Sequence, residues 1–184
     1  MKTPHGIIVF GAAGSGTSTI GKELARLLGF AHFDTDDFHW QKTDPPFIQI
    51  HTDHHREVLF KSAVDVCNGF VASGCMREWG EMFKPMFIMA AFVKTPTILR
   101  IKRLEKREFA RYGQRILSNG DLFNRHRKFI EYAASYDDGG LDMRSLASQE
   151  NWAKTLPCPV ICVDGSESFH KIAFKLANAL SEEI

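Results

Sequence analysis

The feature that most constrains the fold of this chain is a glycine-rich segment close to the N-terminus. The apolar run at 6–10 (GIIVF) predicts a buried strand, and residues 17–28 carry apolar side chains at the spacing of one helical face. The segment between them, GAAGSGTS from Gly11 to Ser18, matches the phosphate-binding pattern G-x-x-x-x-G-K-[ST] at every position but one. A strand before the loop and a helix after it are the context that this pattern requires. We therefore expect the loop to bind the phosphates of a nucleoside triphosphate.

The composition of this loop suits contact with phosphate oxygens. Its small residues let successive backbone N–H groups turn inward, and the helix that follows adds unpaired N–H groups and its positive dipole end. Ser18 is placed to ligate Mg²⁺. Thr17 stands where the pattern has lysine, and it offers a neutral hydrogen bond in place of a full positive charge. The residues expected to bind the nucleotide here are Gly11, Ala12, Ala13, Gly14, Ser15, Gly16, Thr17, Ser18 and Thr19.

Apolar runs and amphipathic stretches alternate along the rest of the chain. Thr95 is expected to cap a long helix with Pro96 at its first position. The alternation predicts a single α/β domain, residues 1–184, with a parallel sheet covered by helices on both faces. Ligands bind such sheets at the carboxyl ends of the strands, where the glycine loop lies. Further strands are expected at 30–33, 70–72, 87–93 and 160–163, and further helices at about 52–67, 122–135, 143–154 and the C-terminus.

An acidic turn follows the second expected strand. Asp34 and Asp36 alternate, so both side chains can point the same way, while Asp37 points elsewhere. Carboxylates at this position can hold Mg²⁺ through water or accept the proton of an attacking hydroxyl. The alternative is that these acids cap a helix and face solvent.

A basic block lies between residues 94 and 128, where eleven Lys or Arg side chains face three acids in a chain of net charge +1. Five of the arginines recur every three or four residues, which places them on one face of the long helix, and Glu105 and Glu108 fall off that face. Planar guanidinium groups suit contact with phosphate or stacking on a base, and we expect this for part of the stripe. A solvated face is the alternative. The stripe consists of Arg100, Arg103, Arg107, Arg111 and Arg115.

Two further clusters allow more than one interpretation. The histidine-rich segment at 51–55 either holds a metal or forms the polar start of a helix. Trp40, Phe47 and Trp79 either line a substrate pocket or pack in the core.

Together these motifs resemble small P-loop kinases. The resemblance is carried by the glycine loop, the D-T-D-D turn at 34–37, the R-L-x-x-R pattern at 103–107 and the V-D-G turn at 163–165. It points first to adenylate kinase-like nucleoside monophosphate kinases, and more distantly to shikimate and gluconate kinases. It implies a P-loop NTPase fold with a five-stranded parallel sheet, an acceptor-binding segment at about 38–85, and an arginine-rich lid at about 103–145.

The resemblance also assigns roles to residues, with ATP and Mg²⁺ as cofactors. Arg103 stacks on the adenine, Arg107 contacts the phosphates, and Asp164 and Gly165 lie near the base. Ser18 and Asp36 hold the metal. The expected catalytic residues are Asp34, Asp36, Arg107 and Arg111. The segment at 38–85 lacks the D-G-[FY]-P-R pattern of true adenylate kinases, which leaves the acceptor open.

Two functions follow from these features. The first is a kinase that transfers the γ-phosphoryl group of ATP to a nucleoside monophosphate or a hydroxyl-bearing metabolite. The second, suggested by Thr17, is a nucleotide-binding sensor with little turnover. We expect a cytoplasmic monomer or homodimer whose partners are a nucleotide and a small acceptor. A membrane span is not expected because the chain lacks an apolar run of about 18 residues, and the near-neutral charge disfavours nucleic acid.

Overall fold

The computed structural model describes residues 4–182, so the ends of the expected domain, residues 1–3 and 183–184, lie outside the described part. Five parallel strands form one sheet in the order β2-β3-β1-β4-β5. The strands are β1 His5–Gly11, β2 Ala31–Asp34, β3 Gly69–Ser73, β4 Phe87–Lys94 and β5 Val160–Asp164. All five expected strands are present, and β1 is the central one, which places the glycine loop in the middle of the carboxyl edge.

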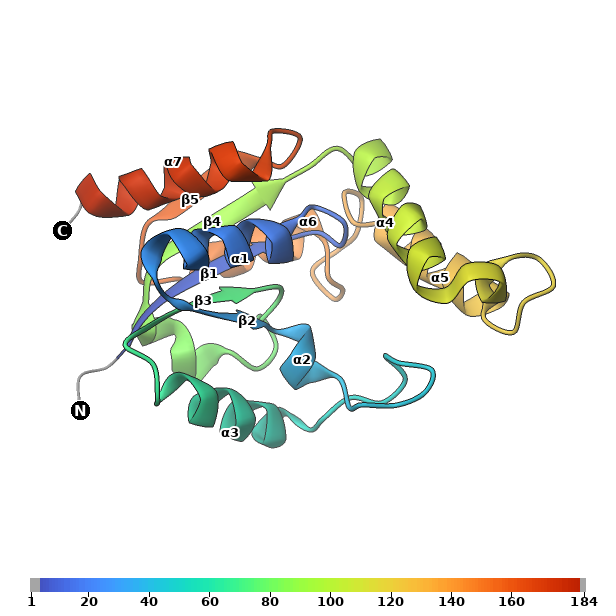
Figure 1. The fold of residues 1–184 in the computed structure, drawn as a ribbon, viewed down its shortest axis with the longest axis horizontal. Coiled ribbons are helices and arrows are strands. Elements are labelled where there is room, and N and C mark those ends of the chain that lie inside the picture. The colour runs from blue at the N-terminus through green and yellow to red at the C-terminus, as the bar shows by residue number, and fades with distance from the viewer. Residues whose placement is uncertain (1–3, 183–184) are drawn as a thin grey trace.

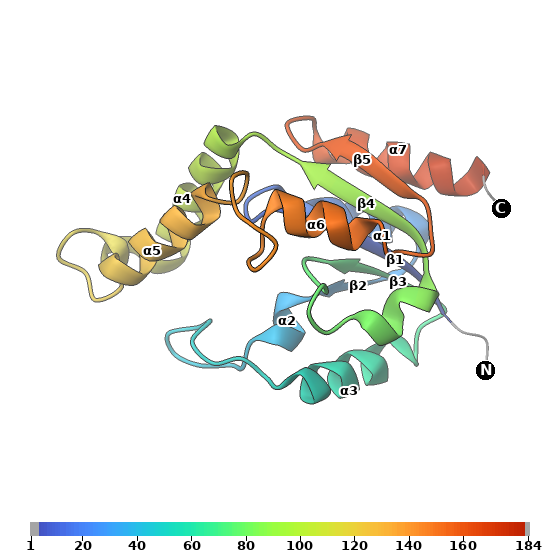
Figure 2. The same ribbon diagram turned by 180° about the vertical axis from the view of Figure 1, so that it is seen from behind.

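Helices cover both faces of the sheet, as expected. The helices are α1 Thr17–Leu28, α2 Asp36–His39, α3 Asp53–Val64, α4 Thr97–Tyr112, α5 Phe123–Ala134, α6 Leu146–Ala153 and α7 Phe169–Glu182, with 3₁₀ turns at Glu81–Met86 and Gly113–Ile116. α1 and α7 pack together on one face, and α3 and α6 lie on the other (Figures 1 and 2).

Each face of the sheet contributes to its own apolar core, because strands that are covered on both sides bury side chains of both orientations. On the α1 and α7 side, Val9 and Val71 pack against Leu24 and Leu176. On the other side, Phe10 stacks on Phe92 with ring centroids 4.6 Å apart, and Trp152 of α6 meets Phe10 edge-on at 5.0 Å. These cores fix the sheet and leave its carboxyl edge open.

The helices α4 and α5 pack side by side and project beyond the carboxyl ends of the strands (Figure 1). The start of α4 differs from the expectation, because Pro96 and not Thr95 occupies the N-cap position. The Thr95 hydroxyl instead donates to the carbonyl oxygen of Ser15 at 3.3 Å, so it supports the glycine loop. Within residues 4–182, no helix combines the length and apolar character needed to cross a bilayer.

Candidate active site

The glycine loop connects β1 to α1, and its conformation depends on two glycines. Gly14 and Gly16 have φ angles of +81° and +98°, which L side chains rarely adopt. A Cβ atom on Gly14 would also lie 2.6 Å from the carbonyl oxygen of Arg100, so α4 packs directly against the loop. Gly16 is the residue before α1 and has no side chain with which to cap the helix, and the first turn of α1 carries no acid. The helix therefore presents uncompensated backbone N–H groups to the cavity, which favours an anion there.

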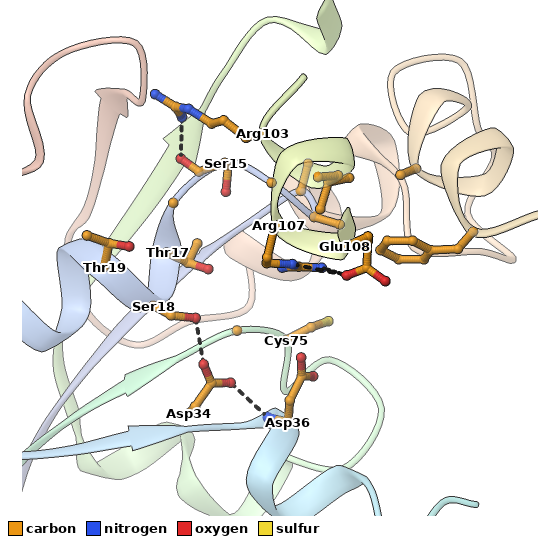
Figure 3. Close-up of a pocket in the computed structure, with 18 of the residues that line it drawn as sticks. Ser15, Thr17, Ser18, Thr19, Asp34, Asp36, Cys75, Arg103, Arg107 and Glu108 are labelled. Carbon is orange, nitrogen blue, oxygen red and sulfur yellow. Dashed lines mark hydrogen bonds and ion pairs between the residues drawn. The ribbon is translucent and has the colours of Figure 1, made fainter. Parts of the chain in front are cut away.

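The Ser18 hydroxyl and the carboxylate of Asp34 form a short hydrogen bond in the site (Figure 3). Ser18 Oγ, at the start of α1, donates to Asp34 Oδ2 at 2.5 Å. The other carboxylate oxygen of Asp34, at the end of β2, accepts the backbone N–H of Asp36 at 3.0 Å. Both carboxylate oxygens of Asp34 are thus oriented. The hydrogen-bond partner of Ser18 is therefore Asp34, whereas Asp36 is a further residue of the cavity lining.

Asp36 opens α2 and has an unusual electrostatic environment. Its side chain reaches the solvent of the cavity, yet enough protein surrounds it that partial desolvation raises its pKa above the usual range of an aspartate. The nearby negative charge of Asp34 raises the pKa further, and Arg144 and Arg107 oppose the rise. A carboxylate with a raised pKa next to cations is suited to accepting a proton.

The arginine stripe divides into three groups, so only part of it faces the cavity. Arg103, Arg107 and Arg111 line the cavity, and Arg103 Nη1 donates to the Ser15 carbonyl at 3.4 Å (Figure 3). Arg115 forms an ion pair with Asp121 at 2.7 Å. Arg100 is completely buried. Only the middle of the stripe is therefore placed to contact a phosphate, because Arg100 is buried. The expected position of Arg115 on the long helix was wrong, since α4 ends at Tyr112 and Arg115 lies in the 3₁₀ turn that follows.

Arg100 is a structural residue that joins the start of α4 to the end of α5. Its Nε donates to the Thr95 carbonyl at 3.1 Å and its Nη1 to the Ala133 carbonyl at 2.9 Å. Its Nη2 donates to Thr97 Oγ1 at 2.7 Å and to Asp137 at 3.3 Å. With every nitrogen engaged, Arg100 is unable to contact a ligand.

Glu108 was expected to lie away from the stripe, and the structure corrects this. It is buried and accepts from Arg107 Nε and Nη2 at 3.2 and 3.1 Å, and Arg111 lies 3.7 Å from the same oxygen. The long side chain of Arg107 folds back along the helix toward its neighbour, which a helical wheel of Cα positions does not represent. Two cavity arginines therefore share one carboxylate that offsets part of their charge.

Several residues that the sequence did not single out belong to this site. Arg144 Nη2 donates to the carbonyl oxygen of Gly11 at 2.9 Å, and Gln149 Nε2 donates to the same oxygen at 3.2 Å. The Tyr136 hydroxyl donates to Gln149 Oε1 at 2.5 Å. These residues come from α6 and the segment before it, far from the loop in sequence and outside the arginine stripe. No local pattern could have identified them, because the fold alone brings them to the loop.

The glycine loop, the acidic turn and the helices α4 and α5 line one cavity of about 1290 Å³. Trp40, Phe47 and Trp79 all line it, and Trp79 also packs against Phe60 of the core. Arg111 lies over the Phe47 ring at 4.9 Å, and Arg125 of α5 donates to the carbonyl oxygens of Pro46 and Phe47. Side chains of α4 and α5 thus contact the segment at 40–50 and hold it in place. Pockets that bind one small ligand measure roughly 300–1,000 Å³, so this cavity is larger than a single such ligand requires.

Two other expected features lie at or beyond the margin of the cavity. Gly165 lines it, whereas the Asp164 carboxylate accepts the backbone N–H and hydroxyl of Ser166 at 2.8 and 2.7 Å and so shapes its own turn. The histidine-rich segment at 51–55 forms the polar start of α3, where Thr52 caps the helix. Among residues 4–182, no group of three or more His, Cys, Asp or Glu side chains is arranged to hold a metal.

The strand order, the glycine loop and the uncapped helix after it define a P-loop kinase fold. The chain belongs to the same family as the uncharacterized protein YqaC of Bacillus subtilis (strain 168), with which it is 32% identical over 175 residues, 95% of this chain and 97% of YqaC. No family model matches the chain.

Two further likenesses concern the fold and one local segment. The shikimate kinase of Acinetobacter baumannii in complex with shikimate superposes with a TM-score of 0.58 at 16% identity, covering 98% of this chain and 95% of that one. A probable gluconokinase of Rattus norvegicus is 49% identical over 39 residues, 21% of each chain. These proteins support the more distant part of the resemblance, to shikimate and gluconate kinases. The adenylate kinase-like part stays a prediction.

Proposed function

We propose that this chain is a kinase that transfers the γ-phosphoryl group of ATP to a hydroxyl group of a small metabolite. The observation that carries the proposal is the Ser18–Asp34 pair, which lies at the uncapped start of α1 in the same cavity as Asp36, Arg103 and Arg107. These are the groups that phosphoryl transfer requires: a phosphate cradle, oxygen ligands for a metal, a proton acceptor and positive charge.

The donor half of the cavity fits MgATP. The backbone N–H groups of the glycine loop would bind the phosphates, and Arg103, which reaches the loop, would lie at the nucleotide. Ser18 and Asp34 offer oxygen atoms alone, which is the ligand type that Mg²⁺ prefers together with substrate phosphates and water. The geometry favours Asp34 over Asp36 as the partner of Ser18 at the metal. Mg²⁺ would supply neutralisation of phosphate charge, which lowers the barrier to transfer.

The acceptor half begins at Asp36. Its carboxylate would accept the proton of the attacking hydroxyl, and its raised pKa improves the match to that task. Arg107 and Arg144, which both lower the pKa of Asp36 by their charge, would stabilise the transferring phosphoryl group in the place of the missing lysine. The likeness to shikimate and gluconate kinases supports an acceptor with hydroxyl groups.

Ser18→Ala tests the donor site. Because the variant removes a metal ligand, we expect ADP release in the presence of ATP, Mg²⁺ and a panel of hydroxyl-bearing acceptors to fall about 10²- to 10³-fold, by analogy with other single electrostatic contacts at reacting phosphates and oxyanions. Ser62→Ala, an exposed serine on α3, is the matched control and should retain full turnover. Equal turnover in Ser18→Ala and the wild type would refute the proposal that this loop binds MgATP.

Thr17→Lys separates the kinase from the nucleotide-binding sensor suggested by the absent lysine. If arginines already supply the charge, the new lysine is redundant and competes with them, and we expect unchanged or lower turnover. The measurement is the rate of ADP formation with the acceptor panel. A large gain in rate for Thr17→Lys would instead indicate a native site built to bind nucleotide without transferring its phosphoryl group.

A further inference from the structure

His39 has a protonation state that is fixed by its neighbour. Arg56 Nη1 of α3 lies 2.8 Å from His39 Nδ1, and the Arg56 side chain is buried and also pairs with Asp53. A guanidinium group has donors and no acceptor, so Nδ1 must accept this hydrogen bond and carry no proton. The ring is therefore neutral, with its proton on Nε2.

The same ring belongs to the lining of the substrate cavity. His39 lines the cavity, and its Nδ1 edge is turned to Arg56, which leaves Nε2–H as the group available to a ligand. His39 and Asp36 lie three residues apart on α2, so they occupy the same side of the helix. The backbone of His39 is anchored as well, because its carbonyl accepts the N–H of His51 at 2.9 Å.

We infer that His39 is an acceptor-binding residue, whose Nε2–H donates to an oxygen of the acceptor next to the hydroxyl that Asp36 deprotonates, and that Arg56 is the positioning residue that fixes this tautomer. The inference rests on the proposed function. It defines the acceptor as a molecule with two neighbouring oxygens, one a hydroxyl and the other a second hydroxyl, a carbonyl or a carboxylate.

The surroundings of His39 keep the ring neutral. Desolvation lowers its pKa, the positive charges of Arg56 and Arg144 lower it further, and the negative charges of Glu78 and Asp53 oppose them. A neutral donor at this place has a chemical advantage, because it can recognise an acceptor oxygen without adding a proton that would compete with Asp36 for the role of acid or base.

Two amide variants separate binding from a purely structural role. His39→Asn places its amide oxygen near the position of Nδ1, so it can keep the Arg56 contact while it loses the donor to the cavity. His39→Gln places its amide N–H near the position of Nε2, so it can keep the donor while it loses the Arg56 contact. We expect His39→Asn to raise the KM of the acceptor about tenfold with the KM of ATP and the Tm unchanged. His39→Gln should return the KM of the acceptor to within about threefold of wild type at a lower Tm.

The experiment has two readouts on the full chain: the ¹⁵N shifts of the His39 ring, and KM values for whichever of glycerol, D-gluconate and shikimate is phosphorylated fastest. We expect the neutral Nε2–H tautomer and the KM pattern above. An Nδ1–H tautomer, or a KM that rises in His39→Gln and not in His39→Asn, would overturn the role of His39 alone. Absence of turnover with every acceptor would overturn the proposed function and the acceptor contact together, whichever tautomer is found.

Discussion

Asp36→Asn is expected to reduce kcat about 10²- to 10⁴-fold, the range by which a positioned general base accelerates proton transfer. The amide has nearly the shape of the carboxylate and leaves the backbone N–H that orients Asp34 in place. Nucleotide binding should therefore survive, and MgATP should raise the Tm of the variant as it does that of the wild type. Asp65→Asn, at an exposed acid just after α3, is the matched control and should behave as the wild type.

The pH dependence of kcat/KM is a second test of Asp36 as the general base. Asp36 acts as a base only when it is ionised, and its pKa is raised by desolvation and by Asp34. In the wild type kcat/KM should fall as the pH decreases through that raised pKa, at a higher pH than for an ordinary aspartate. Asp36→Asn should lose this acidic limb. If Asp36→Asn keeps both its kcat and the acidic limb of its pH profile, Asp36 is not the general base. If MgATP no longer raises the Tm of the variant, Asp36 is instead a ligand of the metal.

The second large effect concerns stability. Arg100→Ala is expected to lower the free energy of unfolding by ~3–5 kcal/mol, as removal of one partner from a buried ionic network does. The cost arises mainly from the carbonyl oxygens of Thr95 and Ala133, which lose their donor inside the protein at about 1–3 kcal/mol each, and from the space that the buried side chain leaves, because the ionic partner Asp137 is itself 44% exposed. The check is urea unfolding, where the midpoint should fall without a change in slope.

Arg127→Ala provides the control for this loss of charge. Arg127 lies on α5, its side chain is 60% exposed, and its contact with Glu131 is long at 3.7 Å. Such exposed pairs contribute little, so the free energy of unfolding should change by less than ~1 kcal/mol. If Arg100→Ala and Arg127→Ala lower the free energy of unfolding equally and only slightly, the buried contacts of Arg100 do not stabilise α4 and α5.

Much of the fold was predictable from local patterns. The apolar strands at 6–10 and 87–93 and the helix at 17–28 are long and regular, and each lies where the sequence indicated. The glycine loop was recognisable because its φ angles and close packing demand small residues at fixed spacing. The short helix α2 was indicated only by the alternative that the acids of the turn cap a helix, since a single turn between two polar segments carries no periodicity; Asp36 and Asp37 lie in its first turn, and Thr35 is the residue before it.

The site was predictable where its residues are close in sequence. Ser18 follows β1 and the acidic turn follows β2, with β3 between these two strands, and the shared carboxyl edge of the parallel sheet brings them together. The roles of Arg100 and Glu108 depended on side-chain direction and burial, which spacing on a helix does not reveal. Arg144 reaches the loop from 133 positions away in the chain, so only the folded structure identifies it. His39 offered a signal in its spacing from Asp36, but its tautomer depends on Arg56.

We propose above that the γ-phosphoryl group of ATP passes to a metabolite hydroxyl in this cavity. The most direct test is ³¹P NMR of the wild-type chain with ATP, Mg²⁺ and hydroxyl-bearing acceptors, with Ser18→Ala run in parallel. We expect a phosphate ester that accumulates in step with ADP in the wild type and is strongly reduced in the variant. Inorganic phosphate in place of the ester, or no ADP above the level of Ser18→Ala, would contradict it.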